Sequence, residues 1–531
     1  MGSLGHESRE GRMQDLPFKL KNEKLFHQKS HVHGEWTESI SGDWFSVADP
    51  GTGEIWAHCV NNATEDVDRV VKSSHAAFQS YKKLNPKMRA QLLSKFDALI
   101  RENREDLARM LVYETGKPFA EGCGEIDYAT SFTHWFAGEA ERISGTVHVA
   151  AAPNRRVFTI KQPIGVVVGL APWNFPIATA LRKVAAAMAA GCTIIIKPSP
   201  ETPFTTLALA HLAQQAGFAA GVFNVLPANL ENTPSVCEAL CKHPLVSKVT
   251  LTGSTRVGKL VTKHCAEGLK KVTLELGGNC PYIIFADANL EQALSHLMAL
   301  KFKHAGQVCV TANRVYVQAE VYDKFAAMVA DATRKLKLGH GAAEDTTIGP
   351  VTTPQSLVKI ENQVKDALAH GGKVIVGGQR VTDRGGYFFE PSVITNMTQD
   401  MLLTREETFG PICGLYKFDT EEEVVSYANS TSLGLASYFF TKDVDRTWRL
   451  LENLEAGIIG MNTGKLGCRQ RKAYLQARIS LTQYSTGNSG AADSPFGGIK
   501  QSGYGKESGR DVGVAEYLIT KTGTLTLEGQ Y

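Results

Sequence analysis

Short apolar, β-branched runs that alternate with helical stretches constrain the fold of this chain more than any other feature. The runs are residues 164–170, 193–196, 222–226 and 246–251, and the stretch 205–216 is one of the helical segments between them. Strands that alternate with helices at this spacing predict a parallel sheet covered by helices on both faces. A second alternating set begins after about residue 280, and 531 residues are enough to bury more than one core. We therefore expect two α/β domains.

The two ends of the chain depart from this pattern. Residues 1–25 are polar and lack periodicity, which predicts a flexible tail. Residues 64–115 are mostly helical, with Leu93, Phe96 and Ile100 at helical spacing. Residues 517–527 alternate weakly, so we expect an edge strand there that a partner subunit can share.

Charge and composition exclude several classes of protein. The net charge is only +3 and no basic patch is interleaved with aromatics, so neither nucleic acid nor a membrane surface is an expected partner. No apolar stretch reaches the roughly 18 residues of a membrane helix. The ten cysteines are scattered and form no Cys-x-x-Cys pair, so no metal site is expected and a reducing compartment is favoured. The N-terminus lacks the apolar core of a secretory signal, and we expect a cytoplasmic protein.

Three residues supply the parts needed for chemistry on a carbonyl group. Cys309 ends the motif Gly-Gln-Val-Cys, Glu275 stands 34 residues before it, and Asn174 is the centre of Pro-Trp-Asn-Phe-Pro. They are a thiol nucleophile, a carboxylate base and an amide that can hold an oxyanion. Each one alone is more often an ordinary structural residue. Together, in this order, they predict thiol chemistry on an aldehyde or acyl group.

Other residues suggest a nucleotide. The run from Gly253 to Lys259 matches the start of a phosphate-binding loop, but Leu260 follows where that loop needs Ser or Thr for magnesium. A strand–glycine–helix turn still offers backbone N–H groups to a pyrophosphate, which suits a dinucleotide. Lys197 ends the second strand and could reach a ribose or phosphate. Glu407 and Phe409 share a turn that could grip a ribose and flank a nicotinamide, although an ordinary turn is as good an interpretation of this motif alone.

From about residue 30 to its end, the chain resembles the aldehyde dehydrogenase superfamily. The stretches 161–165, 251–255, 406–411 and 495–498 are most similar to the succinate-semialdehyde dehydrogenase branch. The resemblance implies an α/β fold with two Rossmann-like parallel-sheet domains and a small β oligomerisation element, in a homodimer or homotetramer. The parts it implies are a tail (1–25), a dinucleotide-binding domain (26–144 and 164–277), a catalytic thiol domain (278–501) and an oligomerisation element (145–163 and 502–531).

The resemblance also implies an activity, the NAD- or NADP-dependent oxidation of an aldehyde to a carboxylic acid. Cys309 would form a thioester, Asn174 and the Cys309 N–H would hold the oxyanion, and Glu275 would activate water. The cofactor-binding residues implied are Trp173, Lys197, Pro198, Ser199, Pro200, Gly253, Ser254, Leu276, Glu407 and Phe409. NAD-preferring members often carry Glu at the position of Pro200, whereas here the acid is Glu201, so both cofactors stay open.

The substrate expected from the resemblance is succinate semialdehyde. Arg182 matches one of two arginines that hold the distal carboxylate in this branch, and Lys303 stands at the position of the second. Lysine keeps the charge but loses the bidentate fork, so another small or pathway-specific aldehyde is the alternative. An acylating enzyme that uses coenzyme A is disfavoured because Glu275 is retained. A non-catalytic protein with this fold should have lost Cys309 or Glu275, and both are present.

Residues 465–487 interrupt the resemblance. The segment has five basic residues and no acid, and its removal would change the net charge from +3 to −2. Deleting it would join residues 464 and 488 into an uninterrupted family-like sequence. We therefore hypothesise that it is a translated intron from a faulty gene model. If the segment is real, we expect it to be a surface insertion that alters substrate access or impairs catalysis.

Overall fold

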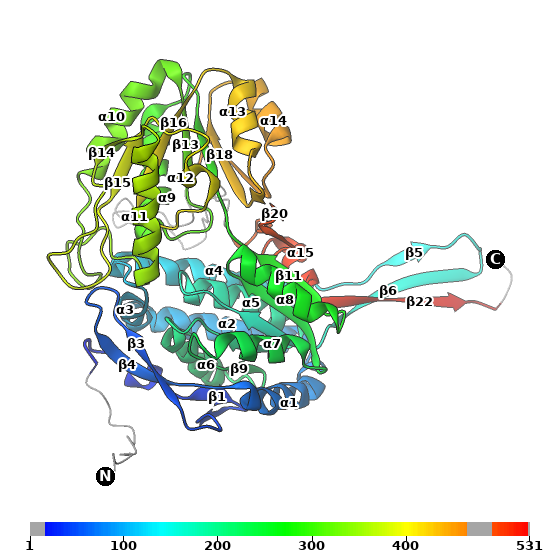
Figure 1. The fold of residues 1–531 in the computed structure, drawn as a ribbon. Coiled ribbons are helices and arrows are strands. Elements are labelled where there is room, and N and C mark those ends of the chain that lie inside the picture. The colour runs from blue at the N-terminus through cyan, green and yellow to red at the C-terminus, as the bar shows by residue number, and fades with distance from the viewer. Residues whose placement is uncertain (1–15, 465–490, 529–531) are drawn as a thin grey trace, which may run out of the picture.

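The computed structural model describes residues 16–464 and 491–528, so the segment 465–487 lies outside the described residues (Figure 1). Its first large sheet has eight strands in the order β2-β1-β9-β8-β7-β10-β11-β21. Strands β9, β8, β7, β10 and β11 run parallel, and β1, β2 and β21 are antiparallel additions at the two edges. In chain order these strands are β1 (Ser30–Val32), β2 (Glu35–Thr37), β7 (Val166–Leu170), β8 (Thr193–Lys197), β9 (Phe223–Val225), β10 (Val246–Thr252), β11 (Lys271–Glu275) and β21 (Gly503–Tyr504).

Helices cover both faces of this sheet. They are α1 (Thr64–Tyr81), α2 (Pro86–Glu102), α3 (Arg104–Thr115), α4 (Phe119–Arg142), α5 (Pro176–Ala190), α6 (Pro203–Ala216), α7 (Thr233–Lys242) and α8 (Thr255–Ala266). Every residue of α5 is buried. Its many alanines let it pack closely between the sheet and α4, and Gly191 ends it in the left-handed conformation (φ 91°).

The second large sheet has seven strands in the order β14-β15-β16-β13-β12-β18-β19, all parallel except β14. The strands are β12 (Pro281–Ile284), β13 (Arg314–Gln318), β14 (Lys373–Val376), β15 (Ser392–Thr395), β16 (Ile412–Phe418), β18 (Ala436–Phe440) and β19 (Ile458–Met461). The helices are α9 (Leu290–Lys301), α10 (Tyr322–Thr333), α11 (Pro354–Ala369), α12 (Leu402–Arg405), α13 (Glu421–Asn429) and α14 (Val444–Asn453). The predicted α/β class with two parallel sheets is confirmed.

Three small sheets complete the architecture. They are β3 (Trp44–Ala48) with β4 (Ile55–Val60), β17 (Leu433–Gly434) with β20 (Ile499–Lys500), and the three-stranded sheet β22-β6-β5. The last consists of β5 (Val147–Val149), β6 (Arg155–Pro163) and β22 (Leu518–Thr526), and it projects away from the rest of the chain (Figure 1). The expected C-terminal edge strand is β22. The short α15 (Arg510–Ala515) connects β21 to it.

Part of the predicted N-terminal tail is ordered, which corrects that prediction for residues 16–25. Leu25 is fully buried in the short helix η1 (Glu23–Leu25), and Leu16, Phe18 and Leu20 pack against the same core. The Asn22 N–H also donates to the Asp106 carboxylate (2.8 Å). The segment is polar on average, but its alternating apolar residues pack it against the first domain. Residues 1–15 lie outside the described residues.

Among the described helices, none has the length and apolar character needed to cross a membrane.

Candidate active site

The residues predicted from the first domain lie at the carboxyl ends of its parallel strands. Asn174 follows β7, Lys197 ends β8, Gly253 follows β10 and Glu275 ends β11. The carboxyl ends of parallel strands meet at one edge of a sheet, where α/β proteins bind their ligands. The topology therefore brings four residues from separate parts of the sequence to one edge.

Cys309 comes from the second domain, on the loop that leads to β13. Three consecutive left-handed residues precede it: His304 (φ 48°), Ala305 (φ 51°) and Gly306 (φ 76°). A side chain on Gly306 would meet the carbonyl oxygen of Gly410 at 2.1 Å, so only glycine fits there. Cys309 keeps part of its surface exposed, whereas its neighbours Val308 and Val310 are buried. The loop thus leaves Cys309 less enclosed than its two neighbours.

The glycine pair after Glu275 serves close packing against this loop. A Cβ on Gly278 would lie 2.2 Å from the Cys309 carbonyl oxygen, and a Cβ on Gly277 would lie 3.0 Å from the Glu407 carboxylate. The Gly278 N–H donates to the Glu407 carboxylate (3.0 Å). Gly277 and Gly278 therefore allow the thiol loop and Glu407 to approach the end of β11.

Asn174 is held by hydrogen bonds to both its side chain and its backbone. Its side-chain amide donates to the Gln307 carbonyl oxygen (3.0 Å), two residues before the thiol, and its own backbone carbonyl accepts from Lys117 (2.9 Å). Lys117 is buried and ion-paired with Glu125. The amide is consequently held beside the loop that carries Cys309, as an oxyanion donor requires.

Glu275 is buried, and neither of its carboxylate oxygens has a hydrogen-bond partner among the described residues. Burial, reinforced by the neighbouring Glu507 carboxylate, raises the pKa of Glu275 to about 8. Burial and the Glu275 carboxylate also raise the pKa of the Cys309 thiol, and the Arg182 guanidinium acts in the opposite direction. The resting site therefore holds its base and its nucleophile largely protonated at neutral pH.

Two charged residues that the sequence analysis missed lie in the same network. Lys183 donates to the Glu507 carboxylate and to the Thr252 hydroxyl (both 2.6 Å), and Arg182 is ion-paired with Glu507 (3.6 Å). Lys183 could have been found as a lysine inside an otherwise apolar helix. Nothing in the sequence connects Glu507 to Lys183 and Glu275, which lie far earlier in the chain, because only the fold brings them together.

The predicted cofactor residues form two groups. At the end of β8, Lys197 is buried and donates to the Thr233 hydroxyl (2.6 Å), and the Ser199 hydroxyl donates to Glu201. Pro198 and Pro200 flank Ser199 on the same loop. At the start of α8, Ser254 accepts from the Val257 N–H (3.3 Å) and caps the helix. Leu276 packs over α8 closely enough to exclude a side chain at Gly258.

The second group lies beside the thiol loop. Trp173 and Phe409 contact each other edge-to-face (5.4 Å between centroids), and Phe409 has left-handed backbone (φ 54°). Burial raises the pKa of Glu407 to about 7. These groups together fit a dinucleotide. A ribose hydroxyl can accept a hydrogen bond from the lysine and donate one to the carboxylate, and the helix N-terminus suits a pyrophosphate. The aromatic pair suits a nicotinamide. The room that Gly277 leaves beside Glu407 supports the same fit.

The two predicted substrate residues have different neighbours. The Arg182 guanidinium is buried between the rings of Phe132 (5.1 Å) and Phe496 (4.2 Å). The Lys303 ammonium lies 5.5 Å from the Phe175 ring and keeps some exposure. Phe175 follows Asn174 directly. Arg182 lies on α5 and Lys303 follows α9, so the two cations come from different domains.

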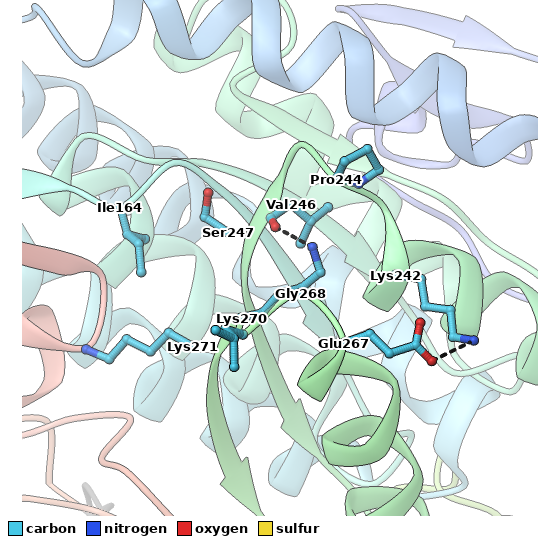
Figure 2. Close-up of a pocket in the computed structure, with 10 residues that line it drawn as sticks. Ile164, Lys242, Pro244, Val246, Ser247, Glu267, Gly268, Lys270 and Lys271 are labelled. Atoms are coloured by element: carbon cyan, nitrogen blue, oxygen red, sulfur yellow. Dashed lines mark hydrogen bonds and ion pairs between the residues drawn. The ribbon is translucent and has the colours of Figure 1, made fainter.

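A cavity of about 770 Å³ lies elsewhere, at the amino ends of β10 and β11. Figure 2 shows its residues, with Lys242 paired to Glu267 (3.3 Å) and Lys270 donating to the Val246 carbonyl (2.7 Å). None of the predicted site residues lines it. Because it opens at the opposite ends of the strands, it is separate from the candidate active site.

Comparison with known proteins agrees with this geometry. The model of the aldehyde dehydrogenase family matches residues 36–523. The NADP+ succinate-semialdehyde dehydrogenase 1 of Schizosaccharomyces pombe is 44% identical over 94% of this chain and 95% of its own length. The 3-sulfolactaldehyde dehydrogenase of Pseudomonas putida is 43% identical over 94% and 98%.

Solved structures give the same result. The crystal structure of succinate-semialdehyde dehydrogenase from Burkholderia pseudomallei has a TM-score of 0.89 and 39% identity, and covers 96% of this chain and all of its own. Betaine aldehyde dehydrogenase from Staphylococcus aureus in complex with NAD+ has a TM-score of 0.87 at 33% identity, over 96% and 97%. The site combines a thiol, a carboxyl and an amide at the end of a parallel sheet, and the family model matches most of the sequence. The chain belongs to the aldehyde dehydrogenase family.

Proposed function

We propose that this enzyme oxidises succinate semialdehyde to succinate with NAD or NADP. The observation that carries the proposal is the Cys309 thiol, presented beside the Asn174 amide and within electrostatic reach of Glu275 and Arg182. The names of several relatives, among them that of the Schizosaccharomyces pombe enzyme, support the substrate.

The site residues account for the successive steps. Cys309 loses its proton and its sulfur attacks the aldehyde carbon, and the oxyanion is held by the Asn174 amide and the Cys309 N–H. A nicotinamide bound in this site would supply the hydride acceptor, and loss of the hydride from the adduct would leave a thioester on Cys309. Glu275 then takes a proton from water, which attacks the thioester and releases the acid and the thiol.

The same proposal assigns the cofactor residues. Lys197 and Glu407 hold ribose hydroxyls, and Gly253 with Ser254 at the start of α8 meets the pyrophosphate. Phe409 and Trp173 flank the nicotinamide side. The walls of the cofactor site are formed by Pro198, Ser199, Pro200 and Leu276. Relatives named for NADP+ and a neighbour solved with NAD+ leave both cofactors in the proposal.

An aldehyde with a different anionic end is the second candidate. Lys303 supplies a point charge where a guanidinium fork would select a planar carboxylate, and it lies near the buried Glu121 carboxyl, whose pKa burial raises. A sulfonate is not planar and suits a point charge, and a relative at 43% identity is named for 3-sulfolactaldehyde. Comparing kcat/KM for the two aldehydes distinguishes the candidates.

We further propose a homodimer or homotetramer assembled through β5, β6 and β22. The strand registers place six exposed apolar residues on one face of this sheet, because residues opposite each other in antiparallel strands share a face. They are Val147, Val149, Phe158, Ile160, Ile519 and Leu525. An apolar face on a projecting sheet is the expected signature of a subunit contact.

The predicted division into domains is kept in this proposal. The two large sheets support a dinucleotide-binding part (26–144 and 164–277) and a catalytic thiol part (278–501). In the oligomerisation element (145–163 and 502–531), β21 and α15 pack on the first domain, so β5, β6 and β22 are its contact surface. A cytoplasmic location is also proposed, and it is supported by free thiols at all described cysteines.

The test is absorbance at 340 nm with succinate semialdehyde, using NAD and NADP separately, on the chain as written and on a chain lacking 465–487. Turnover by either form supports the proposal, and the better cofactor follows from the two rates. Turnover by the shortened form alone supports the translated-intron hypothesis as well. Failure of both folded forms with this aldehyde, together with turnover of another, transfers the assignment to the second candidate.

A further inference from the structure

Tyr128 lies on α4, facing the site from the helix that packs against α5. Its hydroxyl accepts a hydrogen bond from the Arg182 Nη2 (3.2 Å), and its ring contacts Phe132 edge-to-face (4.9 Å between centroids). The charges of Cys309 and Glu275 both influence its pKa, which burial raises. Tyr128 nevertheless keeps part of its surface exposed, as do Cys309 and Lys303. Tyr128 therefore lies beside the site, in contact with Arg182 and within electrostatic range of Cys309 and Glu275.

The guanidinium beside it is largely engaged. The rings of Phe132 and Phe496 both pack against it, Glu507 is ion-paired with Nη1 (3.6 Å), and Nε is buried without a partner among the described residues. The Glu507 carboxylate offsets part of the positive charge. Arg182 alone is consequently a weakened anchor for an anionic substrate.

The Tyr128 hydroxyl can donate a hydrogen bond while it accepts one from Arg182. Its oxygen accepts from Arg182, and its own hydrogen has no acceptor among the residues that the structure describes. A phenol whose oxygen accepts from a cation is polarised and becomes a better donor. Arg182 also fixes the orientation of the hydroxyl, so the donor is preorganised.

We infer that Tyr128 is a specificity-determining residue, whose hydroxyl donates to an anionic oxygen at the far end of the aldehyde. The inference rests on the proposed function and deepens it. Tyr128 and the unpartnered Nε of Arg182 supply two donors from two helices for one carboxylate or sulfonate. Selectivity for short aldehydes with an acidic end then depends on Tyr128 as much as on the cation.

Replacing Tyr128 with Phe removes one oxygen and keeps the ring packed on Phe132. Arg182 stays held by its two aromatic neighbours and Glu507, so the change isolates the hydroxyl. Hydrogen bonds to charged groups lose about tenfold or more in affinity when the donor is removed. Tyr427→Phe is the matched control, because it removes a hydroxyl that donates to Glu423 (2.9 Å) in the other domain.

The experiment measures kcat and KM of both variants and of the unaltered enzyme for succinate semialdehyde and for butanal, at saturating cofactor. We expect Tyr128→Phe to raise KM for the acidic aldehyde about tenfold, with butanal kinetics and the Tyr427→Phe control unchanged. An equal effect on both aldehydes, or no effect on either, overturns the inference. Butanal turnover also shows that the variant is folded.

Succinate binding, measured by calorimetry, gives a readout that does not need turnover. Binding about tenfold weaker in Tyr128→Phe supports the inference even if the assay conditions prevent oxidation. Equal binding in the two proteins, or no binding to the unaltered enzyme, overturns it. If neither aldehyde is oxidised by an enzyme that binds succinate through Tyr128, it is the proposed function that fails.

Discussion

Two carboxyl groups, Glu275 and Glu507, share the site with the Cys309 thiol, and burial, followed by the charge of Glu507, raises the pKa of Glu275. Glu275 has no hydrogen-bond partner among the described residues, whereas Glu507 is held by Lys183 (2.6 Å) and the Thr250 hydroxyl (2.8 Å). Glu275 keeps its proton until the pH exceeds its raised pKa.

This balance predicts the pH dependence of the reaction. Glu275 acts as a base only after losing its proton, so kcat, which includes hydrolysis of the thioester, should rise as pH increases through about 8. Glu507→Gln removes the repelling charge, while Lys183 and Arg182 stay, so it should move the rise to lower pH. Rate measurements between pH 6 and 9.5 check both points. A profile that falls over this range, or a shift to higher pH in Glu507→Gln, contradicts the assignment.

Arg182 affects both the substrate and the thiol. Arg182→Ala should raise KM for succinate semialdehyde by about tenfold or more, well beyond its effect on the KM of butanal. It should also slow both substrates, because the guanidinium is the group that lowers the pKa of the Cys309 thiol. Kinetics with both aldehydes, together with the pH dependence of iodoacetamide alkylation, separate the two effects. An identical change in KM for both aldehydes excludes the substrate role.

At the scale of the elements, the strands and the residues at their ends followed from the sequence. The run 164–170 is β7, shortened because Gly165 has positive φ (137°), and 205–216 is α6, begun earlier by Pro203. The left-handed run before Cys309 was not predictable, since neither His304 nor Ala305 favours positive φ. The surrounding structure imposes it.

The apolar sheet face gives a prediction about assembly. Val149→Lys adds a charge to the apolar face formed by β5, β6 and β22, on the edge strand β5, where Val149 is fully exposed. It should convert the oligomer to smaller species in sedimentation experiments. Thr522→Lys, on the opposite face of β22, is the control and should leave the assembly unchanged. A monomeric unaltered enzyme, or an intact oligomer in Val149→Lys, contradicts the proposed contact.

An imidazole cluster at the N-terminal edge predicts acid sensitivity. His27 stacks on Trp36 (3.5 Å between centroids) and contacts His211 (3.2 Å). Burial and His211 lower the pKa of His27 to about 4, and burial lowers that of His211. Because the folded pKa is below the unfolded value, the stabilisation is present above about pH 6.5 and is lost as pH falls toward 4.

Thermal unfolding between pH 8 and 5 checks this, and His27→Phe is expected to flatten the decline. A pH dependence that is the same in His27→Phe would exclude the cluster as its source.

For the whole molecule, the family and the two-sheet architecture could be predicted because their motifs are local. The assembly of the site could not, because Glu507 and Phe496 reach it from the C-terminal part of the chain. The docking of residues 16–25 was missed for the same reason, since their apolar partners lie on a distant helix. The roles of the individual site residues stay predictions until they are tested.

Residues 465–487 also concern the whole chain. Their removal should leave an active, stable enzyme, because it joins residues 464 and 488 into an uninterrupted family-like sequence. The intact mass of the protein from its natural source tests whether the segment exists. A mass that includes it refutes the translated-intron hypothesis.

The most direct test of the mechanism is to trap its covalent intermediate. Glu275→Gln removes the base that hydrolyses the thioester, so this variant, mixed with succinate semialdehyde and NAD or NADP and then quenched in acid, should accumulate acyl-enzyme. Mass spectrometry of the digested protein should find one succinyl group on the peptide that contains Cys309. Absence of the group from a variant that still reduces one equivalent of cofactor, or its presence on another cysteine such as Cys280, would contradict the account.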